Sequence, residues 1–172
     1  MALTLQVNKG GIGPANPYAG PTAFATGQSS PQTTTSGTDT TPVVTETYLV
    51  DVFVPHNHLS TGFQLLNGSL VAGNVTAILY DSNGAPITQS ASTVQANAAA
   101  LQLLPWATAQ NLRGPAKYII GLQFNNTGAR FRTHILGAFG ASKKTAETYG
   151  TATAVTPPTT HTTGLGPMGS AY

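Results

Sequence analysis

Two histidines separated by one residue are the first candidates for chemistry in this chain. His56-Asn57-His58 follows an apolar run, and on an extended segment both imidazoles project to the same side. Imidazole pairs of this kind occur in zinc sites, but a zinc site needs further ligands. The other candidates are His134, His161 and five scattered acids, and none of them occurs at a ligand spacing. We therefore predict no metal centre.

Acidic residues are too few for a calcium site or for glycoside hydrolysis. Residues 81–84 (DSNG) begin like a calcium loop, but no acid follows to supply the bidentate ligand, so they predict a tight turn. A glycosidase needs two carboxylates at a defined separation, and the central part of the chain offers only Glu46, Asp51 and Asp81. No nucleophile elbow of the G-x-S-x-G type is present. The sequence predicts neither catalytic residues nor a cofactor.

A short basic stripe is a candidate binding surface. Arg130, Arg132 and His134 alternate with apolar or β-branched residues, which predicts that they share the strand face opposite the core. An outward stripe of this kind would pair with acidic groups of a neighbouring subunit or contact a phosphate. A plain solvated strand face is the alternative, and we favour it.

The single tryptophan is a second candidate. Trp106 follows Pro105 and could stack on a sugar ring, which would make it a glycan-binding residue. A lone tryptophan near a strand end more often covers the edge of a core. The core position is therefore favoured.

The composition indicates assembly more than chemistry. Only 12 of the 172 residues are charged, and five of these lie outside residues 42–141. Charged residues make up 7% of the chain, against roughly 25% in ordinary soluble domains, which suits surfaces that other proteins cover. The net charge of +2 comes without a Lys/Arg run, so no specific nucleic-acid binding is predicted. No apolar run approaches the length of a membrane span, so no membrane partner is predicted.

Alternation and turn signals place strands in the centre of the chain. The predicted strands are 47–54, 63–66, 75–80, 87–90, 101–104, 118–124 and 131–139. Pro55 and Pro105 end two of them, and Asn67-Gly68 predicts a hairpin. Residues 93–100 are compatible with a strand or a short helix. The pattern predicts an all-β fold, a single antiparallel β-sandwich over residues 43–141, jelly-roll-like in its connections.

Two nearly uncharged flanks enclose this domain. Residues 1–42 hold five prolines, and residues 142–172 hold nine threonines with further proline breaks. Neither flank can bury enough apolar surface to fold alone. We predict an extended N-terminal arm, ordered on binding other subunits, and an extended C-terminal tail. The predicted subunit contacts of the arm are Pro14, Pro17, Tyr18, Pro21 and Phe24.

Several strand–turn–strand stretches carry a resemblance. They are residues 58–68 (HLSTGFQLLNG), 75–84 (VTAILYDSNG), 112–124 (LRGPAKYIIGLQF) and 129–133 (ARFRT), with the endings 157–161 (PPTTH) and 166–172 (GPMGSAY). Together they resemble small β-sandwich structural proteins of tailed-bacteriophage virions, of the capsid decoration or accessory type. The resemblance begins near residue 47, and it brings no functional residues with it. It implies a location in the virion, assembled in the bacterial host cytoplasm.

The sequence therefore predicts a non-enzymatic virion structural protein, most directly a capsid decoration or cementing subunit. Its expected partners are the major capsid protein and copies of the chain itself, with a trimer as one arrangement. A tail, neck or fibre-associated adsorption module, with glycan-binding loops around Trp106, is the alternative. A free carbohydrate-binding module is a second alternative, and the two flanks argue against it.

Overall fold

The computed structural model describes residues 24–25, 37–135 and 139–172. These residues form strands and turns without a helix, so none of them belongs to a helix that could cross a membrane. The strands are β1 (Phe24–Ala25), β2 (Thr38–Thr40), β3 (Thr47–Val54), β4 (His58–Leu66), β5 (Asn74–Tyr80), β6 (Pro86–Gln89), β7 (Thr93–Val94), β8 (Leu101–Leu112), β9 (Ala116–Phe124), β10 (Phe131–Thr133), β11 (Ala141–Lys144) and β12 (Gly169–Ala171).

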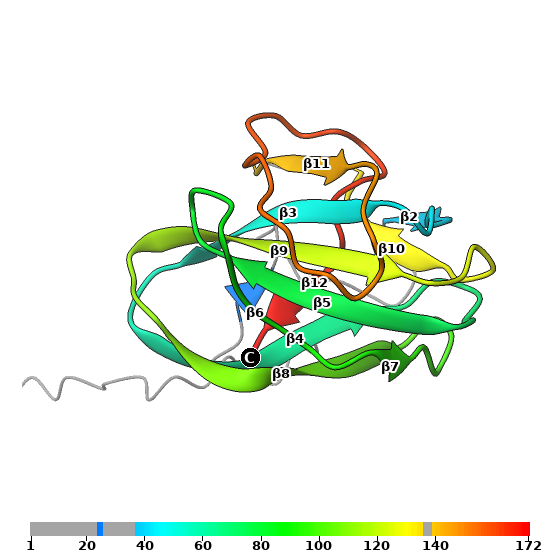
Figure 1. Cartoon of the computed structure of the whole chain (residues 1–172), viewed down its shortest axis with the longest axis horizontal. Helices are drawn as coiled ribbons and strands as arrows, with labels where there is room; N and C mark the ends of the chain where they lie inside the picture. The colour runs from blue at the N-terminus through cyan, green and yellow to red at the C-terminus, as the bar shows by residue number, and fades with distance from the viewer. Residues whose placement is uncertain (1–23, 26–36, 136–138) are drawn as a thin grey trace, which may run out of the picture.

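Two antiparallel sheets pack against each other as a sandwich. One sheet has the order β11-β3-β9-β5-β6, with β7 also pairing with β5, and the other has the order β1-β12-β4-β8. A short third ladder joins β10 to β2. In Figure 1 the strands β3, β9 and β5 form the upper layer, and β4 and β8 lie below it. The predicted all-β sandwich is confirmed, and its jelly-roll connectivity stays a prediction.

The main core lies between the two sheets. Alternate residues of each strand project inward, so β3 and β4 each contribute one apolar row. An aromatic group joins β10 to the upper sheet: Phe124 stacks on Phe131 with ring centroids 4.8 Å apart, and Tyr48 meets Phe131 edge-on at 4.9 Å. The buried members of this core are Tyr48, Val50, Val52, Val54, Phe63, Leu65, Val75, Ala77, Leu79, Leu104, Trp106, Leu112, Ile120, Leu122, Phe124, Ala129 and Phe131.

A second apolar cluster lies on the opposite face of the upper sheet. It consists of Leu49, Ile78, Tyr80 and Ile119, which point away from the main core, together with Val155. Strands that are buried on both faces have near-continuous apolar sequences, as β5 and β9 do here. The outer row must therefore be covered, and Val155 comes from the C-terminal segment that covers it.

The C-terminal segment is a third layer of the fold. β11 pairs with β3 from Ala141↔Val50 to Lys144↔Thr47, and β12 pairs with β4. Between these strands the chain passes across β3 and β9, visible as the orange trace in Figure 1. The predicted extended C-terminal tail is therefore wrong, because this segment packs on the chain's own outer apolar row.

Two buried carboxylates attach the start of this segment to the sandwich. Asp51 on β3 accepts the backbone N–H of Gly140 at 3.0 Å and a bond from Lys117 at 3.2 Å. Glu46, just before β3, forms an ion pair with Lys143 on β11. A buried carboxylate is tolerated only where such partners replace its water, so these pairs fix the position of β11.

Glu147 secures the middle of the segment. It accepts bonds from Lys144 at 2.8 Å and from the Thr153 hydroxyl at 2.7 Å, and it lies 3.4 Å from the Thr47 hydroxyl of β3. Burial by itself would raise the pKa of Glu147. The hydrogen bonds and the charge of Lys144 outweigh it, so the pKa lies below its ordinary value. The ionised form therefore holds the segment in place.

Two predicted strand ends are wrong. β8 continues through Pro105 to Leu112, because β8 is an edge strand and Pro105 lies opposite Gly62 where the register shifts. A missing N–H at such an edge costs no ladder bond. The last predicted strand, 131–139, ends instead at Thr133.

Turn signals were interpreted correctly in one place and wrongly in another. Asn67-Gly68 is no hairpin, since β4 and β5 belong to different sheets and the chain crosses between them there. Residues 81–84 do form the predicted tight turn: the Asp81 carboxylate accepts the N–H groups of Asn83 and Ala85, both at 2.9 Å. Residues 93–100, which were compatible with strand or helix, contain the short strand β7.

Replacing Val155 with alanine is expected to lower the free energy of unfolding by about 1–3 kcal/mol, because it leaves a gap over the outer apolar row. The matched control is Val94→Ala, at a valine that is 66% exposed, with an expected change within about 0.5 kcal/mol. Urea unfolding measures both. Equal effects in the two variants would show that residues 145–160 do not cover the sheet.

Glu147→Gln is expected to make the free energy of unfolding depend less on pH in the acid range. A carboxylate with a lowered folded-state pKa stabilises the fold above its ordinary value of 4.5, and this contribution is lost as pH falls through the lower folded-state pKa. Urea unfolding between neutral and acid pH checks this. Identical pH slopes for the wild type and the variant would contradict the role of Glu147.

Candidate functional site

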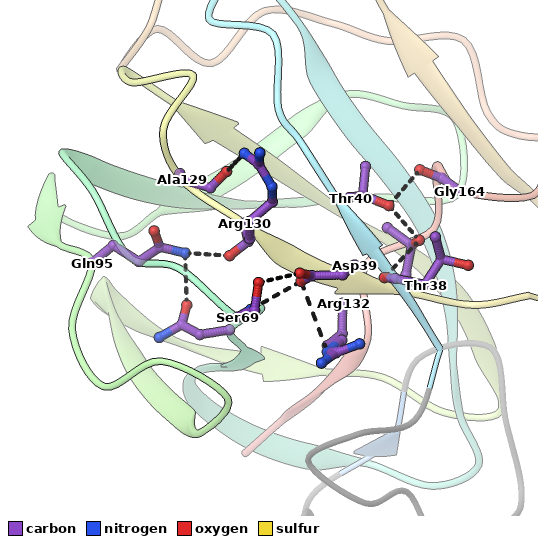
Figure 2. A network of polar contacts seen from close by, with 11 residues as sticks. Thr38, Asp39, Thr40, Ser69, Gln95, Ala129, Arg130, Arg132 and Gly164 are labelled. Carbon is purple, nitrogen blue, oxygen red and sulfur yellow. Dashed lines mark hydrogen bonds and ion pairs between the residues drawn. The ribbon is translucent and has the colours of Figure 1, made fainter.

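The N-terminal segment joins the domain at β2. β2 pairs antiparallel with β10 in the register Thr38↔Thr133, Asp39↔Arg132 and Thr40↔Phe131. The hydroxyls of Thr40 and Thr133 share a hydrogen bond of 2.8 Å. We call β2, β10 and residues 67–70 the β2–β10 junction, which Figure 2 shows. The predicted arm boundary at residue 42 is therefore too late, because β2 belongs to the folded part.

Asp39 is the centre of this junction. Its carboxylate accepts the backbone N–H of Ser69 at 3.0 Å and the Ser69 hydroxyl, and Arg132 Nε lies 3.9 Å from the same carboxylate (Figure 2). Gly68 makes this approach possible, because a Cβ there would collide with Asp39 and with Arg130. Sequence reasoning missed Asp39. The feature that could have identified it is that Asp39 is the only acidic residue among residues 1–42.

Beside the junction lies a network of three buried amides. Gln95 Nε2 donates to Asn67 Oδ1 at 3.0 Å and to the carbonyl of Arg130 at 2.7 Å. Asn67 Nδ2 in turn donates to Gln102 Oε1 at 2.9 Å. The network ties the crossing at Asn67 to β8 and to the residue before β10. The Asn67-Gly68 dipeptide was predicted as a turn, so this role was missed too.

The predicted outward basic stripe is wrong in its main feature. His134 is 2% exposed, because β10 ends at Thr133 and the C-terminal chain lies over it, with the His134 N–H donating to the Gly166 carbonyl at 2.9 Å. Arg130 donates to the carbonyl of Ala129 at 2.8 Å. Arg132 faces Asp39, whereas Arg130 bonds the carbonyls of neighbouring residues, so these two arginines and the buried His134 do not form an outward stripe.

Trp106 belongs to the main core. It is 6% exposed, and its indole N–H donates to the Ser60 hydroxyl at 2.9 Å. The favoured core position is thus confirmed, and the stacking platform for a sugar ring is wrong. A buried indole has no face to offer to a ligand.

The predicted arm contacts are only partly within view. Pro14, Pro17, Tyr18 and Pro21 lie outside the described residues. Phe24 lies in β1, where it pairs with Ala171 of β12. Residues 24–25 therefore form the edge strand of the β1-β12-β4-β8 sheet.

The two histidines of residues 56–58 lie in different environments, because His56 is exposed and His58 is buried. His58 begins β4 and is buried, and this burial, together with the neighbouring His56, lowers its pKa. Over residues 37–135 and 139–172, no three His, Cys, Asp or Glu side chains come close enough to hold a metal ion.

Asp39→Ala is expected to open the β2–β10 junction, because both donors of Ser69 lose their acceptor. A hydrogen bond to a charged group contributes about 1.5–3 kcal/mol, so amide exchange in β2 and β10 is expected to accelerate about ten- to a hundredfold. Asp81→Ala is the control, since Asp81 also accepts backbone N–H groups but lies in another turn. Unchanged exchange in the Asp39 variant would exclude this role.

Comparison with known proteins identifies no relative: no family model, curated sequence or solved structure matches this chain.

Proposed function

We propose that this chain is a non-enzymatic structural subunit of a bacteriophage virion, a decoration or cementing protein that binds shell subunits. The observation that carries the proposal is an uncharged sheet. None of the strands β1, β12, β4 and β8 contains an Asp, Glu, Lys or Arg residue. We call the outer side of β4 and β8 the uncharged face.

The uncharged face exposes apolar side chains. Leu59 is 53% and Leu103 is 54% exposed, and Pro105, Ala107 and Ala109 follow Leu103 along the outer row of β8. The strand register places Leu59 opposite Asn111 and Leu103 opposite Gln64, so the apolar row runs along β8 from Leu103 to Ala109. The centre of a protein interface is likewise depleted of charge. Burying such surface contributes about 25 cal/mol per Å². The face therefore suits a broad contact with another protein.

The sheet that carries this face also contains β1, the first strand of the described residues. β1 is the edge strand of the same sheet, and 23 residues precede it. Fully extended, a chain of that length spans roughly 75–80 Å, enough to contact a neighbouring subunit. The resemblance to virion structural proteins supplies the kind of partner: the major capsid protein, and further copies of this chain.

The competing functions lose their support. Adsorption through glycan-binding loops and a free carbohydrate-binding module both relied on Trp106 as a sugar platform. Its burial removes that argument. No described feature favours either function over a decoration subunit.

Leu103→Glu is expected to reduce incorporation into particles by about tenfold or more, because an unpaired charge would be buried in the contact. The fold should persist, since Leu103 is more than half exposed. Val94→Glu on β7, in the other sheet, is the matched control and should be incorporated normally. Quantitative mass spectrometry of purified particles measures both variants, and equal incorporation would contradict the proposed contact.

Copy number separates the shell from other locations. A decoration subunit should be present on the order of hundreds of copies per particle, because a symmetric shell repeats its binding site many times. Roughly six to a few dozen copies would instead indicate the neck or tail. The same mass-spectrometric measurement on wild-type particles gives this number.

A further inference from the structure

Nearly every charge in the described part of the chain has a partner within the chain. Asp39, Glu46, Asp51 and Glu147 form the four ion pairs, with Arg132, Lys143, Lys117 and Lys144 respectively. Asp81 accepts bonds within its own turn, and Arg130 donates to neighbouring carbonyls. Among the described residues, only the Arg113 side chain remains as a charge without an ion pair or hydrogen bond. Arg113 is exposed, at the end of β8.

The backbone of Arg113 is nevertheless held firmly. The Tyr118 hydroxyl accepts the Arg113 N–H at 2.9 Å and donates to the Arg113 carbonyl at 3.1 Å. The next N–H, of Gly114, donates to Asn57 Oδ1 at 3.1 Å. Gly114 has no room for a Cβ, because the backbone of Val54 and His56 lies against it. The backbone that carries the guanidinium is thus fixed, so only the side chain itself has to be ordered on binding a ligand.

Arg113 borders a pocket of about 360 Å³ between the β3–β4 and β8–β9 connections. Its lining residues are Asn57, His58, Leu59, Asn111, Leu112 and Arg113. The lining combines two leucines with two asparagines, His58 and Arg113. Ligand sites commonly have this make-up, with an apolar wall and a few polar groups that fix orientation.

The charge of the pocket matches a monoanion. Burial, with a contribution from His56, lowers the pKa of His58, so this imidazole is neutral near pH 7. Arg113 then supplies a single positive charge, and its planar fork fits both oxygens of a carboxylate. The larger groove beside β11, of about 580 Å³, differs in this respect. Its lysines, Lys143 and Lys144, are already neutralised by buried glutamates.

We propose that the Arg113 pocket binds a carboxylate group, presented either by an acidic side chain of a partner protein or by an acidic sugar. The guanidinium donates to the carboxylate oxygens, and the amides of Asn57 and Asn111 are the neighbouring polar groups of the lining. The pocket adjoins one end of the uncharged face, because Leu59 belongs to both. The inference itself does not depend on the proposed virion function.

NMR titration of the full-length chain tests the site. The probes are sodium acetate, N-acetylglutamate amide and sodium glucuronate at constant ionic strength. We expect saturable shifts of the amides around Asn57, Asn111 and Arg113, with dissociation constants of about 1–10 mM. Tighter binding of the glutamate derivative would assign the site to an acidic side chain, and tighter binding of glucuronate to an acidic sugar.

Two substitutions and one competing anion make the test decisive. Arg113→Gln should weaken binding about tenfold or more, and Arg113→Lys should bind less tightly than wild type, because lysine lacks the bidentate fork. Arg130→Gln, which removes a cation elsewhere, should leave the titration unchanged. The proposal is overturned if no carboxylate saturates, if Arg113→Gln binds like wild type, or if sulfate binds as tightly as the carboxylates. Such a failure would leave the particle copy number unaffected.

Discussion

The fold depends on covering the outer apolar row of the β11-β3-β9-β5-β6 sheet, the row that faces away from the main core. Leu49, Ile78 and Ile119 face away from the sandwich core, and without a cover they would meet water. At about 25 cal/mol per Å², leaving several large side chains exposed would cost several kcal/mol, comparable to the net stability of a small domain. The C-terminal segment supplies the cover. Its own low apolar content is sufficient for this task because the sheet provides the other half of the contact.

Several of the few charged side chains hold this C-terminal segment in place. Holding a Thr-, Ala- and Gly-rich segment requires directional bonds in place of large side chains, and buried carboxylates such as Asp51 and Glu147 provide them. Asp39 does the same for β2 at the other end of the chain. These acids therefore lie at internal attachments, and none of them lies in the strands of the β1-β12-β4-β8 sheet.

The sequence located most of the strands, but it divided the chain wrongly. Alternation in Thr47–Val54 and the turn at Asp81 are local signals, and both were interpreted correctly. The flanks looked incapable of folding because their composition was judged alone. Ser69 and Arg132 lie far from Asp39 along the chain, so no local pattern announced the junction that joins them. The basic stripe was misplaced for the same reason, since the chain that buries His134 comes about thirty residues later.

By itself, the sequence determined the all-β class and the scarcity of charge, because side-chain period and composition are properties of neighbouring residues. The tertiary structure alone decided which charges are neutralised and which surfaces remain open. Trp106 became a core residue beside Ser60, which is distant along the chain, and distant partners pair Lys117 and Lys143 but leave the Arg113 side chain without one. Burial and ion pairing depend on what covers each residue, and that is settled only when the layers come together.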